Sequence, residues 1–427
     1  EMLSYTKDNF YKYTIGIDNR YGEEKYINPL LWQMGHVIFF YSNHVLDNLI
    51  NCDTFSHIPE FITYCSNNQI SYDDLVNFYD SFITPVENRN GKMLLDFKTC
   101  LFLFEKIYDS LIKYIINNIN NEPSNIESYL ISLGILHNEM HNEAFIFTKL
   151  SVNNELDIKI LTYNYESKLI KDIEFIDYGK GTFIQGNNDN KDFLIFDNEK
   201  PEFTYQINSF KISKYPITEY QYLIFILKGG YTNDTYWSSN GLNWRNKNNI
   251  NMPLYWLYKN GKYLKKIGNK EYDINTNLPI VNISYYEAEA YCNFMGGRLP
   301  YESEYEYVAT NEGKTLFPWG NDLNFNKKCN LNYKNYIRPV NEYQTGNNFK
   351  GIGQLIGNIW EWCEEPIYPY DGFTIDPVYR EMSYPFFGFK KICKGGCFCV
   401  SDFLIHPKYR NAQYPDCRIQ FIGFRMC

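Results

Sequence analysis

The chain has 427 residues, more than one hydrophobic core normally organises, which predicts two or three domains. Hydrophobic residues make up 44% of it, as in globular proteins, and no apolar run approaches the roughly 20 residues that a membrane-spanning helix needs. The formal net charge of -9 argues against a nucleic-acid partner and favours small-molecule substrates. We therefore expect a globular protein that binds neither nucleic acid nor membrane.

The cysteines indicate a reducing environment. There are 11 of them, an odd number, with irregular spacing and no C-x-x-C pair. This pattern argues against a disulfide framework or a zinc ribbon. No signal peptide is recognisable, so we expect a cytoplasmic protein.

The first part of the chain, residues 1–155, is predicted to be helical. Apolar residues recur at helical spacing in four stretches: Leu30–Ile50, Tyr72–Phe82, Leu94–Asn117 and Glu127–Leu150. Four such segments favour an up-and-down four-helix bundle, a fold that builds metal sites on facing helices.

Two histidines in the last of these stretches are candidate metal ligands. His137 and His141 are four residues apart, so on a helix they project from one face about a turn apart. A zinc protease would need Glu directly after the first histidine, but that position is Asn138. Glu139 and Glu143 point away from the imidazole face, so we expect them to be solvated or to support the ligands indirectly.

The third ligand must come from elsewhere among the six histidines. His36 is our first choice, because it lies inside an apolar helical run where an imidazole needs a partner. His44, two turns later, is the competitor. A chance pair or a structural hydrogen-bonding pair at 137 and 141 is the alternative to a metal site.

A polar loop, residues 85–92, separates the second and third helical stretches. Its Arg89 could clamp a substrate carboxylate, since a guanidinium pairs with carboxylates in a bidentate way. The alternative is that Arg89 is simply solvated.

Residues 156–427 have a different texture, with short alternating segments punctuated by Gly, Asn and Pro. Strands are predicted at Asp157–Tyr163, Glu174–Tyr178, Gly181–Gln185 and Thr204–Ile212, and helices at Thr218–Leu227 and Ser284–Met295. Ser284 with Glu287 forms a capping-box pattern. The predicted class is therefore an α+β multidomain protein, with a helical bundle followed by a mixed α/β domain.

Several motifs of the second part resemble the formylglycine-generating-enzyme-like (sulfatase-modifying factor) fold, a C-type-lectin-like architecture. They are Gly181–Gly186, Pro216–Thr218, Gly296–Pro300 with Glu302, Glu304 and Glu306, Gly357–Trp362, Lys394–Gly396 and the closing Gly423–Arg425. The first part resembles a DinB-like bundle through Gly35-His36 and the 137/141 pair. Together the two parts resemble the nonheme iron sulfoxide synthases of ergothioneine and ovothiol biosynthesis.

This resemblance implies an Fe(II) site held by His36, His137 and His141. It also implies oxidative carbon–sulfur bond formation between a cysteine-type thiol and the imidazole of histidine or hercynine, with O2 as oxidant. A true formylglycine-generating oxidase holds copper with two cysteines a few residues after Gly-Gly, but Cys397 and Cys399 follow Gly396 too closely. We interpret these two cysteines as core residues.

In the resembled family a tyrosine shortly after the Gly-Asn-x-Trp-x-Trp motif acts as the acid. The local Pro366-Ile367-Tyr368 resembles the ovothiol type, which predicts Tyr368 as the catalytic phenol and Tyr370 as its neighbour facing the imidazole substrate.

The segment just before the closing Gly-Phe-Arg resembles the substrate-binding segment of this family. Asn411 matches a residue that contacts the imidazole substrate, whereas Gln413 and Cys417 occupy the places of an Asp and an Arg that hold a glutamyl group in the mycobacterial type. Met140 likewise replaces a Gln between the ligand histidines. These departures predict a cysteine-sized thiol.

The sequence therefore predicts an iron- and O2-dependent sulfoxide synthase. The alternatives are an iron-dependent thiol dioxygenase with the same ligands, or a non-catalytic binding protein that keeps the fold. Histidine and hercynine both remain open as acceptor.

Overall fold

The computed structural model describes residues 1–16, 27–91, 93–118, 123–153, 169–189, 193–268, 270–274, 276–333 and 336–427. The chain divides into two compact units. The first contains Glu1–Val152 together with Pro377–Glu381, and the second contains Asn153–Asp376 and Met382–Cys427. A short stretch from the C-terminal half of the chain therefore belongs to the N-terminal unit.

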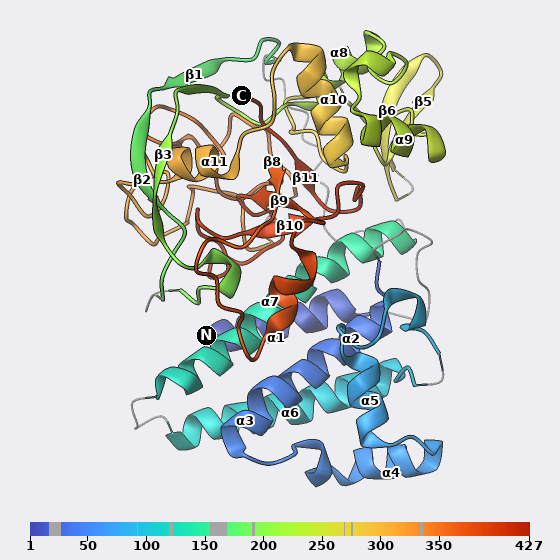
Figure 1. The fold of residues 1–427 in the computed structure, drawn as a ribbon. Helices are drawn as coiled ribbons and strands as arrows, with labels where there is room; N and C mark the ends of the chain where they lie inside the picture. Colours follow the sequence, from blue (N-terminus) through green and yellow to red (C-terminus); the bar gives the residue numbers. More distant parts are fainter. Residues whose placement is uncertain are drawn as a thin grey trace. The chain divides into compact units, whose positions relative to one another are not determined.

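The first unit is helical (Figure 1). Its helices are α1 Met2–Thr14, α2 Leu30–Phe40, α3 Asp47–Ile50, α4 Pro59–Asn68, α5 Tyr72–Tyr79, α6 Phe97–Asn118 and α7 Asn125–Asn153. Three predicted stretches are confirmed as α5, α6 and α7. The prediction of one helix over 30–50 was wrong in one respect, because a π-helical turn, Tyr41–Leu46, separates α2 from α3. The apolar spacing did not reveal α1 and α4.

Helix α2 is the central element of this unit. All of its residues are buried, as expected for a helix that is apolar all round. Two glycines let its neighbours approach closely. A Cβ added at Gly35 would lie 2.0 Å from the ring of Tyr79, and one at Gly134 of α7 would lie 2.7 Å from the ring of Tyr41. Any larger side chain at these positions would push the helices apart.

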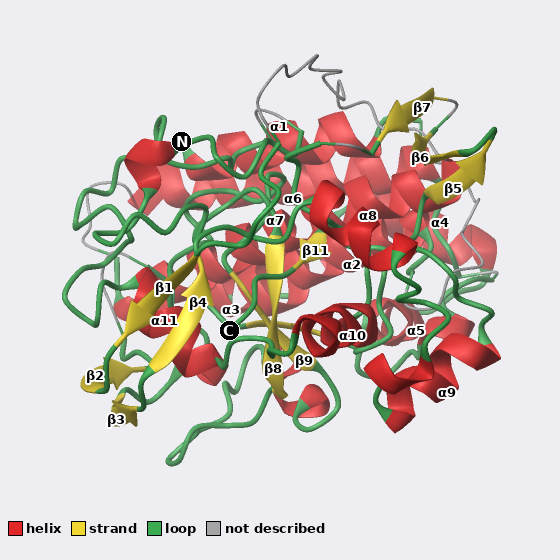
Figure 2. Ribbon diagram, turned by 90° about the horizontal axis from the view of Figure 1, so that it is seen from above, coloured by secondary structure: helices red, strands yellow, loops and turns green. Residues whose placement is uncertain are grey.

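The second unit mixes short strands and helices, joined by long loops (Figure 2). Its helices are α8 Glu219–Leu227, α9 Ser239–Lys247, α10 Tyr285–Met295 and α11 Glu302–Ala309. Its strands are β1 Phe175–Tyr178, β2 Gly181–Gln185, β3 Phe203–Ile207, β4 Phe210–Ser213, β5 Trp256–Lys259, β6 Lys262–Ile267, β7 Lys270–Asp273, β8 Trp360–Pro366, β9 Lys391–Lys394, β10 Asn411–Gln413 and β11 Ile422–Gly423.

Among the described residues, the largest sheet has the order β10-β9-β8-β11, with β11 parallel to β8 and the other pairs antiparallel. The pairs β1-β4 and β2-β3 and the meander β5-β6-β7 are antiparallel. Aromatic and aliphatic side chains from β1 to β4, α11 and the largest sheet form one core cluster. The second unit is therefore built around antiparallel pairs packed on α11.

The sequence predicted several of these elements closely. The strand at Gly181–Gln185 and the helices after Thr218 and Ser284 are confirmed, and Ser284 Oγ and the Glu287 carboxylate form the expected capping box. The single strand expected over 204–212 was wrong, because the chain turns between β3 and β4, which pair with β2 and β1 respectively. The strand expected at 157–163 lies outside the described residues.

The motifs shared with the resembled family serve this fold. Arg425 of the closing Gly-Phe-Arg is fully buried and pairs in a bidentate way with Glu361 of β8, at 2.7 and 2.8 Å. Arg425 also donates to the carbonyl of Ser213 at the end of β4. The arginine therefore links the end of the chain to two separate strands.

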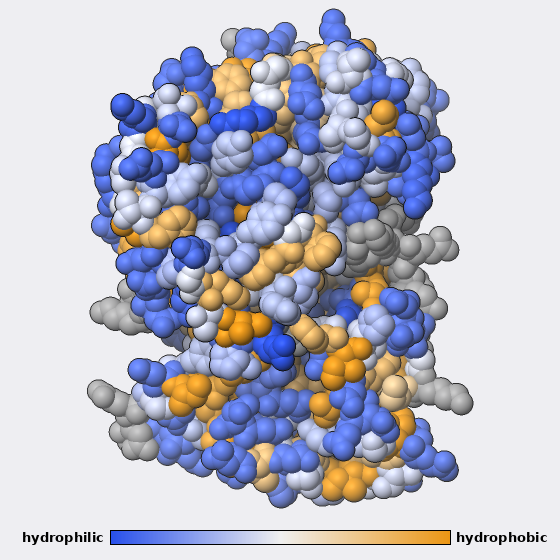
Figure 3. Space-filling model, in the orientation of Figure 1, coloured by the Kyte–Doolittle hydropathy of each residue, from blue (hydrophilic) through white to orange (hydrophobic). Residues whose placement is uncertain are grey.

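Hydrophilic side chains dominate the visible face of the molecule, and apolar side chains appear there in small groups (Figure 3). Among the described helices, none is both long and apolar enough to cross a lipid bilayer.

Candidate metal centre

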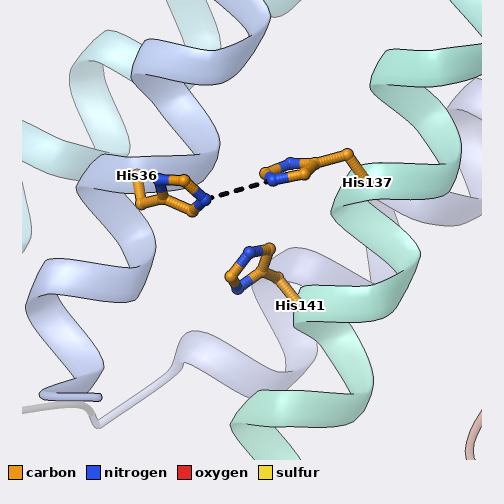
Figure 4. Close-up of side chains that lie close together, drawn as sticks. All are labelled: His36, His137 and His141. Atoms are coloured by element: carbon orange, nitrogen blue, oxygen red, sulfur yellow. Dashed lines mark hydrogen bonds between the residues drawn. The ribbon is translucent and has the colours of Figure 1, made fainter. Parts of the chain in front are cut away.

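Three histidines of the first unit converge (Figure 4). His36 comes from α2, and His137 and His141 come from successive turns of α7. Their ligand atoms all lie within 4.8 Å of one another, and the two facing Nε2 atoms of His36 and His137 are 3.1 Å apart. His36, our first choice for the third ligand, is thus the histidine that lies beside His137 and His141.

A backbone carbonyl fixes the orientation of His36. Its Nδ1–H donates to the carbonyl oxygen of Tyr79, at 2.6 Å. This hydrogen bond sets the tautomer and leaves the lone pair on Nε2, the atom that faces His137. Because Gly35 allows α5 to approach α2, the same close contact brings the Tyr79 carbonyl within reach.

The three imidazoles are held in their neutral form. Burial lowers the pKa of His36 to about 4. Burial, and then the neighbouring histidines, hold the pKa of His137 well below its ordinary value. The same holds for His141, with His36 and Arg89 as the neighbours. Neutral imidazoles keep the lone pairs that metal coordination requires.

Aromatic rings surround the cluster. Trp32 stacks on His36, with centroids 4.9 Å apart and planes 10° apart, and Phe40 stacks on His137 at 3.6 Å. Tyr379 meets both Phe40 and His137 edge-on, with centroid distances of 5.2 and 5.5 Å. Tyr379 belongs to the stretch 377–381 that joins this unit. The cluster therefore has an apolar wall with a phenol beside it.

The residues present fit a metal ion. The Nδ1 atoms of His137 and His141 are buried and have no hydrogen-bond partner among the described residues. A structural histidine pair would normally satisfy such atoms. Three neutral imidazoles without a carboxylate in the cluster suit Fe(II), Zn(II) or Cu(II) better than Mg(II) or Ca(II).

The competitor His44 is not part of the cluster. It lies in the π-helical turn, half-buried, and its ring packs on Phe40 at 4.7 Å. Glu139 and Glu143 are also outside it. Both are buried, which excludes the solvated alternative, while indirect support of the ligands stays a prediction.

Arg89 is buried rather than solvated. Its guanidinium donates to the carbonyls of Thr84 and Ser81 and to the side chain of Asn28, and it stacks on Trp32 at 4.1 Å. It thus supports the ring that stacks on His36. Its binding of a substrate carboxylate stays a prediction.

The two tyrosines predicted from the motif make their contacts in the second unit. Tyr368 is 56% exposed. Tyr370 packs beneath the guanidinium of Arg410, at 4.1 Å, and lies 3.5 Å from the side-chain nitrogen of Gln185. Burial, and then the nearby Glu302, raise the pKa of Tyr370 well above its ordinary value. Their catalytic role stays a prediction.

The predicted substrate-binding residues lie on two elements. Asn411 and Gln413 are half-buried on β10, which pairs with β9, and Met140 is half-buried on α7 between His137 and His141. Cys397 and Cys399, expected in the core, are fully buried, with sulfur atoms 3.3 Å apart and no disulfide.

No motif or periodicity in the sequence pointed to Tyr379. It is one of 40 tyrosines, and it lies in a loop without periodicity or a motif. Only the fold reveals that this stretch packs on the histidine helices. The stacking of Trp32 on His36, by contrast, could have been inferred from their spacing of four residues in a helix.

Comparisons with known proteins identify the class of the chain. The family model of the sulfatase-modifying factor enzyme 1-like domain matches residues 172–427. The chain therefore belongs to this family.

Individual relatives fall into two named groups, hercynine oxygenases and formylglycine-generating enzymes. A hercynine oxygenase from Mycobacterium tuberculosis is 33% identical over 236 residues, which cover 54% of this chain and 55% of the relative. A hercynine oxygenase from Mycolicibacterium smegmatis is 30% identical over 256 residues, covering 58% of this chain and 59% of the relative. A formylglycine-generating enzyme from Thermomonospora curvata is 28% identical, covering 57% and 90% respectively. The chain spans about half the length of the mycobacterial relatives. These relatives confirm the resemblance that the sequence motifs predicted.

Proposed function

We propose that this protein is an iron(II)- and O2-dependent sulfoxide synthase. It joins the sulfur of a cysteine-type thiol to an imidazole carbon of hercynine or histidine. The observation that carries the proposal is the carboxylate-free cluster of His36, His137 and His141, in which the first two are buried and the third is half-buried. The similarity to proteins named hercynine oxygenases favours hercynine as the acceptor, and we assign the first unit to the DinB-like bundles.

The cluster would hold the iron through three neutral imidazoles. When bound, Fe(II) would supply the activation of O2 and a coordination position for the thiol sulfur. The hydrogen bond from His36 to the Tyr79 carbonyl orients one ligand. Trp32 and Phe40 stack on two of the imidazoles, which fixes their planes and excludes water from that side.

The overall reaction balances without a further reductant. One thiol S–H bond and one imidazole C–H bond break, and one C–S bond forms. One atom of O2 becomes the sulfoxide oxygen, and the other leaves as water with the two hydrogens. The thiol sulfur and the imidazole carbon together supply the four electrons that O2 accepts.

A proton must be delivered while the oxygen is reduced, and a phenol is suited to that task. We assign this role to Tyr379, because its ring contacts the ligand His137 within the same unit. Tyr368 and Tyr370 are the alternative phenols. Replacing the proton-donating tyrosine by phenylalanine would keep the ring packing and remove the hydroxyl that donates the proton.

The second substrate is expected to be small. Gln413 and Cys417 provide neither the carboxylate nor the guanidinium that would hold a glutamyl group, so cysteine fits better than a dipeptide. Arg89 remains our candidate to bind the carboxylate of the thiol substrate, and Asn411 our candidate to contact the imidazole substrate. Met140 is expected to line the site between His137 and His141.

Mass spectrometry of the reaction products tests the proposal. The protein is loaded anaerobically with Fe(II), and cysteine is added with hercynine or with histidine before exposure to O2. The expected product has the summed mass of the two substrates, plus one oxygen and minus two hydrogens. The same assay on Tyr379→Phe, Tyr368→Phe and Tyr370→Phe assigns the phenol.

Other products would overturn the proposal. Cysteine sulfinate with no coupled product, from either acceptor, would identify a thiol dioxygenase. No retained iron and no oxygen consumption would identify a binding protein that keeps the fold.

A further inference from the structure

The stretch that carries Tyr379 leaves the second unit and returns to it. It departs after Asp376, contributes Pro377–Glu381 to the helical unit, and re-enters at Met382. Within the helical unit it contacts His137 and Phe40 through Tyr379, and Arg380 lies over the ring of Phe82, at 5.4 Å. Nothing in its own sequence specifies this path.

A single carboxylate of the second unit holds both ends of this excursion. Asp197 Oδ2 accepts the backbone N–H of Asp376, at 3.0 Å. The hydroxyl of Ser383 lies 2.8 and 2.9 Å from the two carboxylate oxygens of the same residue. Asp197 is 3% exposed and Ser383 is fully buried, so these bonds are shielded from water. The two ends are thereby pinned to one point.

The position of Asp197 is itself fixed. Asp197 is the first residue of the 3-10 turn Asp197–Glu199. The second residue of this turn, Asn198, accepts a hydrogen bond from the Arg410 guanidinium through its backbone carbonyl and donates one to the Arg410 carbonyl through its side chain. Arg410 in turn pairs with the buried Glu302, at 2.8 and 3.0 Å. Asp197 is thus adjacent to a buried hydrogen-bond network formed by Asn198, Arg410 and Glu302.

We propose that Asp197 is a positioning residue that closes the 377–381 excursion and so holds Tyr379 against the helices that carry the candidate metal ligands. Closing a loop at its base removes most of the conformations open to its ends. Charge-assisted hydrogen bonds of this kind are stronger than neutral ones. Asp197 touches neither histidine nor phenol and acts through the backbone. The catalytic consequence of this inference rests on the proposed role of Tyr379. The closure of the excursion does not depend on that role.

Hydrogen–deuterium exchange of the full chain tests the closure without any assay of activity. In Asp197→Ala, the amides of 378–382 are expected to exchange at least about 10-fold faster than in the unsubstituted protein, while α10 and α11 exchange as before. Ser383→Ala, which removes one partner and keeps the carboxylate, should give a smaller increase. Asp197→Asn keeps one oxygen acceptor and should fall between these two.

Asp402→Asn is the matched control. Asp402 also joins two loop segments of the second unit, through Asn332, but is not bonded to the excursion. It should leave exchange at 378–382 unchanged. Should Asp197→Ala fail to fold, Ser383→Ala and Asp197→Asn carry the test.

The catalytic arm compares products from the iron-loaded proteins. Asp197→Ala and Tyr379→Phe are both expected to shift the ratio of coupled sulfoxide to cysteine sulfinate toward sulfinate, with Fe(II) content unchanged. Exchange at 378–382 that is the same in Asp197→Ala as in the unsubstituted protein would overturn the closure. Faster exchange with an unaltered product ratio would overturn its catalytic consequence. An unsubstituted protein without coupled product would refute the proposed function instead, and the exchange result would still decide the closure.

Discussion

Two buried polar clusters, one in each unit, differ in how their groups are satisfied. In the helical unit, His36, His137 and His141 face one another with lowered pKa values, and two of their nitrogens lack protein partners among the described residues. In the second unit, Glu302 pairs with Arg410 at 2.8 Å and lies 3.6 Å from Lys394. Although burial raises it, these two cations hold the pKa of Glu302 below its ordinary value.

The difference distinguishes a candidate metal site from a network of buried ion pairs. In the second unit, charges of opposite sign lie close enough to compensate one another, although Lys394 Nζ makes no hydrogen bond to the described residues. Among the histidines, Nε2 of His36 and Nε2 of His137 lie within hydrogen-bonding distance, but Nδ1 of His137 and Nδ1 of His141 have no partner among the described residues. Our proposal is that a cation completes this cluster. Breaking the ion pairs of the second unit should therefore mainly lower stability, whereas removing a histidine of the cluster should mainly abolish metal binding.

The largest effect on stability is expected for Glu302→Ala. It leaves Arg410 and Lys394 buried without their carboxylate, which should lower the free energy of unfolding by about 3–5 kcal/mol. Urea denaturation measures this loss. The exposed pair of Glu174 with Lys214 supplies the control, since Glu174→Ala should cost less than about 1 kcal/mol. Equal losses in the two variants would show that the buried pair is not a stability element.

The pH dependence of stability should reveal the second carboxylate of this network. Burial raises the pKa of Glu306 to about 7, although Lys394 opposes it. The folded protein therefore holds this proton up to higher pH than the unfolded chain does, and the contribution of Glu306 to stability falls as pH rises between about 4.5 and 7.

Glu306→Gln removes this titration. Relative to the unsubstituted protein, the variant should gain up to about 3 kcal/mol in unfolding free energy between pH 5 and pH 8. Urea denaturation at the two pH values gives the comparison. A difference between the two proteins that is independent of pH would contradict the raised pKa.

A smaller effect is expected where the histidine cluster depends on helix packing. Gly35→Ala places a Cβ against the ring of Tyr79, which should cost about 1–3 kcal/mol and weaken Fe(II) binding by displacing the Tyr79 carbonyl from His36. Calorimetric titration with Fe(II) under anaerobic conditions measures the second effect. Gly179→Ala, where nothing lies within 4 Å of the added carbon, is the control. Unchanged affinity in Gly35→Ala would mean that the carbonyl does not orient the ligand.

The sequence was most informative where one element carries the signal. The spacing of His137 and His141, the capping box of Ser284 and the helices α5 to α7 all follow from local periodicity. The choice of His36 over His44 needed a burial argument, and the structure brings His36 into the cluster. The π-helical turn after α2 could not be predicted, because its residues have the same apolar spacing as a regular helix.

Long-range features were beyond the sequence for a physical reason. Tyr379 contacts His137 from a stretch whose two flanking residues, Asp376 and Ser383, both bond to Asp197, far away in the chain. Tyr370 carries the same side chain as Tyr379 and lies only nine residues earlier, but its ring contacts Arg410. Which phenol approaches the ligands depends on the path of the chain, and no local pattern encodes that path.

Metal content of single-histidine variants tests the central claim most directly. The protein and its His36→Ala, His137→Ala, His141→Ala and His44→Ala variants are loaded anaerobically with Fe(II), desalted and analysed by inductively coupled plasma mass spectrometry, with helical content checked by circular dichroism. We predict one iron per chain in the unsubstituted protein and in His44→Ala, and almost none in the other three. Iron retained by folded His36→Ala, or lost from His44→Ala, would contradict the three-histidine site.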